Sequence, residues 1–478
     1  MKKIIATLIF IVSLASNALG SNALASNGLA NPKTFYLDAH HQERRTDGSA
    51  THPFKAIDPL MKAIEQFREK EPLTPITVIV RKGVYPFDKG YLLNRQFNNL
   101  TIKAEAGEQV IFSGGIQLPP DAIKSPDGQI SQVNLKPFKM KNYGRIHSVG
   151  FARPSLNAWT ELFVNGQPMH LSRWPNKGMI KMGKVIETGA IPRNDDFSNK
   201  SAVMAYDSAR ISSWQPSDDK WMSGYFHHGY ADDALRIAKI DTIKKQITTD
   251  GATLYGFNAS HPWNKWYAFN IKEETDEKGE FFIDASKQQL YFVSPDSTVN
   301  EIVLSQLEEP FFSFEEASDI TLQNITFEYS RAALLSLVNS TRITIENCTF
   351  RNSGQWGILV GLGIAPFEDY RHEGTGTPIK GLVGSLDQHL YSNQTFNRQG
   401  GKDNLIKGCH FYNLGSGGIS LGGGDRLTLE AGNNTVRQCT FHDNNRIERS
   451  YRPHIYLTGV GNKVVDCELY NAPSMVML

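Results

Sequence analysis

A short phrase with a cysteine at its centre recurs in the second half of the chain and constrains the fold more than any other feature. The phrase occurs at Cys348, Cys409, Cys439 and Cys467, and a fifth copy has Ile325 in the same position. A position that accepts either cysteine or isoleucine is a buried apolar position. The residue two positions further on is apolar in each copy: Phe327, Phe350, Phe411, Phe441 and Leu469. This alternation predicts a strand with one face buried.

The copies are 23, 61, 30 and 28 residues apart, at positions 325, 348, 409, 439 and 467. Repeats of this period are typical of solenoids, in which each repeat forms one coil. Because the repeated unit is a short strand, the sequence predicts an all-β protein, a right-handed parallel β-helix. Each coil is expected to pair a strand that carries the cysteine position with a second strand, at residues 333–338, 356–360, 418–421, 454–457 and 474–478.

The same geometry bears on the state of the cysteines. Equivalent positions in neighbouring coils lie about 4.8 Å apart, the spacing of paired strands, and parallel Cβ directions are a poor starting geometry for a disulfide. We therefore expect a column of buried free thiols, with a single disulfide between Cys439 and Cys467 as the alternative. No C-x-x-C pair occurs, so the sequence predicts no structural metal site.

The N-terminal residues are organised like a secretory signal peptide. Lys2 and Lys3 precede an apolar run at 4–15, and Ala23 and Ala25 fit a cleavage site. The apolar run is too short to span a bilayer. The sequence therefore predicts a signal peptide at 1–25, no membrane span, and a protein that is secreted or periplasmic. Its 50 basic and 49 acidic residues give no basis for expecting nucleic acid as a partner.

Three further regions follow. Residues 34–115 are expected to form an N-terminal cap and the first coils, with a short helix near 60–67. Residues 116–300 interrupt the repeat, contain six of the seven tryptophans, and predict a β-rich inserted domain. Residues 301–478 resume the coils, with a long loop at 361–404. No capping segment follows the last expected strand, which predicts a C-terminal end that is uncapped or truncated.

Two connections are rich in residues that could act on a substrate. Glycines at 422–424 allow close approach of a ligand, and Asp425 and Arg426 follow them; the alternative is a turn with a mutual ion pair. The segment 442–454 contains several arginines and acids, and His454 begins the next expected strand. Arginine side chains could bind a carboxylate or sulfate group on a sugar, and the alternative is a solvated, self-paired turn.

Several phrases, taken in their order along the chain, resemble those of a known family. They lie at 161–166 with 172–176, at 279–284 with 290–292, and at 423–426, 432–434 and 459–462. In these phrases the chain resembles secreted bacterial right-handed β-helix carbohydrate-active enzymes with a pectate-lyase-like fold, closest to glycoside hydrolase family 141-like proteins. The resemblance runs from residue 34 to the end. It implies later coils that carry the catalytic carboxylates, at positions beyond Leu478.

Together these features favour an exported glycoside hydrolase that degrades a complex plant-wall or algal polysaccharide, or its oligosaccharides, through paired carboxylates. The expected catalytic residues are Asp425, Glu448 and His454, and the expected substrate-binding residues are Arg426, Arg446, Arg449, Trp356 and Asp443. No cofactor is expected. One alternative is a polysaccharide lyase that acts by β-elimination on a uronate-containing glycan, for which calcium would be a candidate cofactor. Another is an inactive or carbohydrate-binding β-helix protein.

Overall fold

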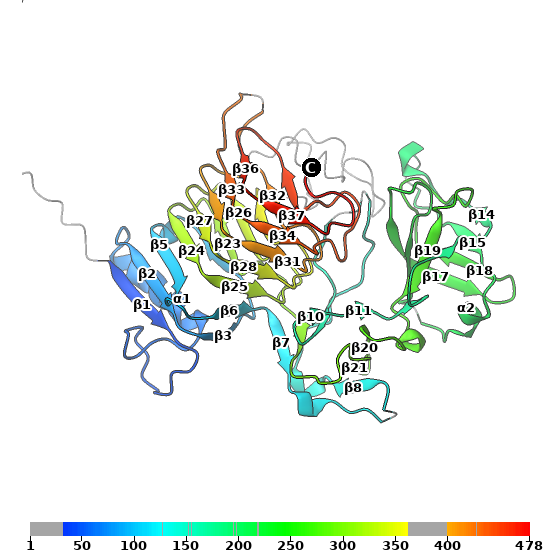
Figure 1. The fold of residues 1–478 in the computed structure, drawn as a ribbon, viewed down its shortest axis with the longest axis horizontal. Helices are drawn as coiled ribbons and strands as arrows, with labels where there is room; N and C mark the ends of the chain where they lie inside the picture. Colours follow the sequence, from blue (N-terminus) through cyan, green and yellow to red (C-terminus); the bar gives the residue numbers. More distant parts are fainter. Residues whose placement is uncertain are drawn as a thin grey trace, which may run out of the picture.

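The computed structural model describes residues 32–478 except 127, 152, 154, 195, 197, 218, 362–398 and 427. The expected signal peptide and most of the expected loop 361–404 therefore lie outside the described residues. No helix in the described part of the chain is long and apolar enough to cross a membrane. Figure 1 shows a stack of coils with a second, separate body of strands extending from one side.

Each complete coil contains three strands, where two were expected, and these strands form three parallel sheets, A, B and C. Sheet A contains β1 (Lys33–Leu37), β2 (Ile76–Val80), β5 (Leu100–Ala104), β24 (Ile320–Gln323), β27 (Thr344–Glu346), β30 (Leu405–Lys407), β33 (Thr435–Arg437) and β36 (Lys463–Val465). Sheet B contains β3 (Gly83–Pro86), β6 (Val110–Ser113), β25 (Ile325–Glu328), β28 (Thr349–Arg351), β31 (His410–Tyr412), β34 (Thr440–His442) and β37 (Glu468–Tyr470). Sheet C contains β4 (Tyr91–Leu93), β23 (Phe312–Glu315), β26 (Leu335–Val338), β29 (Ile358–Val360), β32 (Ile419–Leu421) and β35 (Ile455–Leu457).

The cysteine phrase forms the corner between sheets A and B, here called the A–B corner. The residue before the cysteine position has a positive φ in every copy: Asn324 (59°), Asn347 (53°), Gly408 (63°), Gln438 (55°) and Asp466 (54°). A single left-handed residue bends an extended chain, so a strand of sheet A ends before it and a strand of sheet B begins after it. The expected single strand is therefore two short strands.

Columns of like side chains fill the interior of the stack. The rings of Phe327, Phe350, Phe411 and Phe441 stack face to face, with successive centroids 5.3, 4.7 and 4.6 Å apart. All four cysteines are free, and Cys348, Cys409 and Cys439 are buried, whereas Cys467 in the last coil is partly exposed. The predicted column of free thiols is confirmed.

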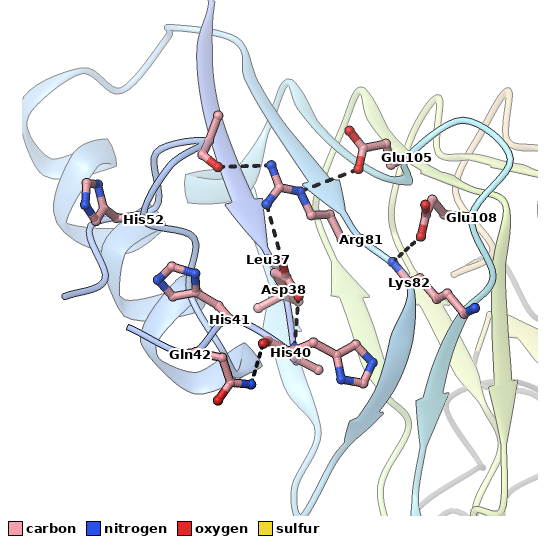
Figure 2. Close-up of polar contacts among 12 residues, drawn as sticks. Leu37, Asp38, His40, His41, Gln42, His52, Arg81, Lys82, Glu105 and Glu108 are labelled. Atoms are coloured by element: carbon pink, nitrogen blue, oxygen red, sulfur yellow. Dashed lines mark hydrogen bonds and ion pairs between the residues drawn. The ribbon is translucent and has the colours of Figure 1, made fainter. Parts of the chain in front are cut away.

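The N-terminal end of the stack is covered by a helix, as predicted. Helix α1 (Ile57–Lys70) contributes its apolar side to the same core as the coils, through Ile57, Leu60, Met61 and Ile64. The loop between β1 and α1 is held by Arg81, which forms ion pairs with Asp38 and Glu105 and donates a hydrogen bond to the carbonyl of Ala50 (Figure 2).

Residues 114–311 separate β6 of sheet B from β23 of sheet C, and their strands form a β-rich insert. One sheet has the order β10 (Gln167–Pro168), β9 (Leu162–Val164), β22 (Ile302–Ser305), β7 (Gly115–Leu118), and a second has β11 (His170–Leu171), β20 (Glu280–Asp284), β21 (Gln289–Phe292), β8 (Ser131–Asn134). The third contains β12 (Arg173–Trp174), β13 (Ile180–Lys181), β14 (Val185–Glu187), β15 (Val203–Ala205), β16 (Trp221–Gly224), β17 (Asp233–Asp241), β18 (Gln246–Thr249) and β19 (Lys265–Phe269), beside the short helix α2 (Ala209–Ser213).

Two corners of the coil carry the long connections. The insert links β6 to β23 and the segment 443–454 links β34 to β35, so both leave the stack at the B–C corner. The segments 361–404 and 422–433 link sheet C to sheet A and leave at the opposite edge of sheet C, the C–A corner. Of the expected strand at 474–478, only Met477 forms a bridge, to Ile455.

Candidate active site

The residues expected to form one site lie at different corners. Asp425 and Arg426 lie at the C–A corner, where the backbone N–H of Asp425 donates to the carbonyl of Glu430 at 2.8 Å. Arg426 is exposed and lines an open hollow of about 450 Å³ together with Tyr456 and Asn462. The segment 443–454 leaves at the B–C corner, so sheet C separates the two groups. The expected pair of Asp425 and Glu448 therefore belongs to two different edges of sheet C.

Three of the expected residues lie in the interior. Trp356 and His454 are fully buried, and Glu448 is 3 % exposed. The ring of His454 contacts the side chain of Asn444 through Nδ1 at 3.1 Å and the carbonyl of Tyr470 through Nε2 at 2.8 Å. Burial lowers the pKa of His454, which favours the neutral ring. All three side chains are packed against other protein groups in the described arrangement.

The charged segment 443–454 attaches the insert to the coils. Arg446 forms an ion pair with Glu161 of the insert, with Nη1–Oε1 and Nη2–Oε2 distances of 2.5 and 3.2 Å. Glu448 accepts hydrogen bonds from Ser155 of the insert at 2.7 and 2.9 Å and from Arg452 at 2.9 Å. Removing a charged group from water costs free energy, so buried charges are tolerated only when they are paired. Most of the polar groups in this segment are therefore engaged by the contact between the two bodies.

Arg449 is the exception in this segment. It is exposed, and it forms no hydrogen bond or ion pair with the described residues. It lines a cavity of about 330 Å³ between the insert and the coils, which we call the junction cavity. The polar and aromatic residues that line this cavity are Trp159, Glu161, His170, Arg173, Ser223, Asp232, Tyr267, Phe269, Phe281, Arg446 and Arg449. Asp443, by contrast, lies on the outer side of sheet B beside His442 and is not part of the cavity.

The junction cavity has an excess of positive charge. The guanidinium of Arg173 lies 3.9 Å from the ring centroid of Tyr267 and donates to the carbonyls of Pro175 and Gly178. Among the described residues no carboxylate lies within ion-pair distance of Arg173 or Arg449, whereas Arg446 is paired with Glu161. Two arginines without a carboxylate partner in one cavity repel each other and favour an anionic ligand.

Two carboxyl groups of the cavity differ in their surroundings. Asp232 is 9 % exposed, and its Oδ1 has no hydrogen-bond partner. Burial raises the pKa of Asp232, although Ser450, Arg449 and Arg452 oppose the shift. Glu161 is 3 % exposed, and both of its oxygens face the guanidinium of Arg446. One carboxyl is therefore disposed to carry a proton, and the other faces a permanent cation.

Sequence reasoning anticipated Arg446 and Arg449 in this region but missed Asp232, Glu161 and Arg173. These three belong to the insert, far from the arginine-rich segment in sequence, and no motif links them to it. The available signal was topological, because the insert and the segment 443–454 replace the same connection in two different coils. Groups of three or more metal-binding side chains do not occur within the part of the chain that the structure describes.

Comparisons with known proteins agree with this architecture. Residues 311–475 match a family model described as a right-handed β-helix region. No curated protein matches the chain. A solved structure described as a glycoside hydrolase is 13 % identical with a TM-score of 0.56, and the match covers 93 % of this chain and 92 % of that one.

A second solved structure, XylC in complex with xylose, is 12 % identical with a TM-score of 0.46, and 92 % of this chain matches 59 % of that one. A third, the gp54 tailspike of Acinetobacter baumannii bacteriophage AP22 with a capsular saccharide, is 10 % identical with a TM-score of 0.16, covering 90 % of this chain and 61 % of that one. At such identities the likeness concerns the fold, and the family model and the first structure confirm the predicted right-handed parallel β-helix.

Proposed function

We propose that this chain is an exported glycoside hydrolase that acts on an acidic polysaccharide, or its oligosaccharides, in the junction cavity. The observation that carries the proposal is that two carboxyl groups in unlike surroundings, Asp232 and Glu161, line one cavity together with aromatic rings and with arginines that have no carboxylate within ion-pair distance. Glycoside hydrolysis requires one carboxyl that donates a proton and a second that acts as base or nucleophile. A structure described as a glycoside hydrolase with the same fold supports the proposal by analogy.

Each group of the cavity has a role in this proposal. Asp232, whose pKa is raised by burial, donates a proton to the oxygen of the glycosidic bond. Glu161, oriented by Arg446, acts as the base or nucleophile. Arg449 and Arg173 bind the acidic group of the sugar, and the rings of Trp159 and Tyr267 provide apolar surface for a sugar ring.

The roles first expected for the segment 443–454 change accordingly. Glu448 is buried against Arg452 and Ser155, so we propose that it holds the insert on the coils and does not contact substrate. Asp425 and Arg426 are accessible at the C–A corner, and their participation stays a prediction. Replacement of Asp425 by alanine tests it, because turnover that is unchanged would exclude a catalytic role for this carboxylate.

In the decisive experiment the full chain is incubated with uronate-containing, sulfated and neutral polysaccharides, and the products are analysed. We expect new reducing ends from acidic glycans without the ultraviolet absorbance of unsaturated uronates. The variant Asp232→Asn is expected to reduce turnover by about 10²- to 10⁴-fold, the usual contribution of a general acid. The matched control is Arg437→Ala, which removes an exposed arginine on sheet A far from the cavity.

Three other outcomes would contradict the proposal in different ways. Absorbing products would identify a lyase that eliminates across the uronate ring. Saturable binding of glycans by wild type and Asp232→Asn alike, with no products from either, would identify a carbohydrate-binding protein. Full turnover by Asp232→Asn together with loss of turnover in Asp425→Ala would move the reaction from the junction cavity to the C–A corner.

A further inference from the structure

Two histidines meet on the outer face of sheet B, away from the junction cavity. Strands β31 and β34 are parallel neighbours in which His410 pairs with Thr440 and Tyr412 pairs with His442. Side chains alternate along a strand, and the phenylalanines between these positions point into the core. His410 and His442 therefore both face outward, on adjacent strands, in diagonal positions.

The two imidazole rings approach each other through their Nε2 atoms. Nε2 of His410 lies 2.7 Å from Nε2 of His442, and Nδ1 of His442 lies 2.6 Å from Oδ2 of Asp443. A carboxylate in this position fixes the proton on Nδ1 of His442. The lone pair on Nε2 of His442 is therefore directed at His410, which supplies a proton from its own Nε2.

The surroundings hold these rings in place. The ring of His442 lies parallel to those of Tyr412 and Tyr470, with centroid distances of 5.3 and 5.0 Å. The hydroxyl of Tyr412 accepts a hydrogen bond from Arg351 at 3.0 Å. Burial lowers the pKa of His410, with the neighbouring His442 acting in the same direction, and a neutral imidazole is the form that binds metals.

We propose that His410 and His442 bind a divalent transition-metal ion of the zinc class through their two Nε2 atoms, with Asp443 orienting His442. Imidazole nitrogens are preferred ligands of zinc, copper and nickel. The proton on Nε2 of His410 moves to Nδ1 of the same ring, so the step conserves protons. With metal–nitrogen distances of about 2.0–2.1 Å, the two nitrogens must move from 2.7 Å apart to about 3.3–3.4 Å, a separation of roughly 0.6–0.7 Å, for a near-tetrahedral ion.

Asp443 cannot share the ion, because its contact is with the opposite nitrogen of the His442 ring. The site thus has two protein ligands, and water completes the coordination shell. His410 and His442 lie on the outer face of sheet B and do not line the junction cavity, so metal binding there does not depend on glycan turnover.

The test titrates the full chain with Zn²⁺ by calorimetry and with Cu²⁺ by electron paramagnetic resonance. We expect one ion per chain, and hyperfine coupling to two imidazole nitrogens in the copper spectrum. His410→Gln and His442→Gln should each leave at most one coupled nitrogen. Asp443→Asn should keep the stoichiometry and weaken binding by about 10- to 100-fold, as outer-shell changes do.

The matched control is His261→Ala, which removes a histidine of the insert that stacks on Trp263. It should leave both titrations unchanged. Absence of saturable Zn²⁺ binding to the wild-type chain would overturn the proposal and leave a proton-sharing pair. Binding retained at full affinity in the His410→Gln/His442→Gln double variant would also overturn it. Circular dichroism of each variant verifies that the coils are folded.

Discussion

At the A–B corner every coil from Asn324 to Asp466 turns on a single left-handed residue, whereas at the B–C corner the connections range from the short 87–90 to the insert at 114–311. The A–B corner faces a continuous column of phenylalanines and thiols. An extra residue there would shift each following side chain to the opposite face. The B–C corner projects outward, so it accepts insertions, and the candidate active site is built from two of them. Each coil thus has one corner whose length is fixed by packing and one corner that tolerates insertions, and functional residues can be added at the second corner.

If this distinction holds, changes in the interior column should affect stability most. Phe411→Ala removes a ring that stacks at 4.7 and 4.6 Å between two others. We expect the free energy of unfolding to fall by about 3–5 kcal/mol, the usual cost of a large-to-small change in a core. Urea unfolding monitored by circular dichroism measures this, with the partly exposed Phe282→Ala on the insert as the control. An equal loss in both variants would contradict the distinction.

A change at the B–C corner should affect the attachment of the insert. Glu448→Gln removes the charge that pairs with the buried Arg452. An unpaired buried guanidinium is costly, and we expect a loss of about 3 kcal/mol in the free energy of unfolding. Limited proteolysis should show early cleavage near Ser155, which Glu448 holds, while the coils resist. Cleavage that begins within the coils would show that Glu448 supports the stack itself.

The A–B corner can be tested at its one glycine. Gly408 has a φ of 63°, and an added Cβ would lie 2.3 Å from Oδ1 of Asn347. Gly408→Ala should therefore cost about 1–2 kcal/mol, because alanine is strained in the left-handed region. The matched variant is Gly408→Asn, which should cost less, since asparagine occupies this position in two other coils. Equal thermal unfolding temperatures for both variants would exclude backbone strain as the cause.

The smallest effect concerns pH. The pKa values of Asp232 and Asp233 are raised by burial, in the case of Asp233 to about 6. At these two positions the folded chain therefore binds more protons than the unfolded chain, whose aspartates titrate near about 3.9. The contribution of these two groups to stability should fall as pH rises through the window between about 3.9 and the raised values. Asp232→Asn should flatten this slope in unfolding measured at several pH values, and a steeper slope would show that its pKa is lowered.

The sequence predicted the solenoid because its period and its buried positions are local properties of the repeat. It did not predict three strands per coil, since a bend at one residue leaves the alternation of Cys348 and Phe350 unchanged. The residues Asn324, Asn347 and Gly408 carried a signal for that bend, because asparagine and glycine favour left-handed backbone. Gln438 carried no such signal for a left-handed backbone, so the neighbouring coils impose the bend at this position.

The candidate site was less accessible to prediction, because its groups meet only through tertiary structure. The sequence marks Arg446 as a charged residue in a turn, but the partner that neutralises it, Glu161, is in the insert. The burial of Glu448 and His454 also depends on tertiary structure, so it could not be predicted from the charge-rich sequence of this segment. Arg449 differs from its neighbours in lacking a partner, which is a property of the assembled molecule.

The pairing of β6 with β25 places Val110 beside Ile325, although the whole insert lies between them in the chain. Bringing such distant segments together costs more chain entropy than joining adjacent repeats and slows the step in which they meet. We expect the coils from β23 onward to assemble first and the strands β1 to β6 to add to them later. The segment synthesised first would then complete its structure last, and α1 would close a stack that had formed from its other end.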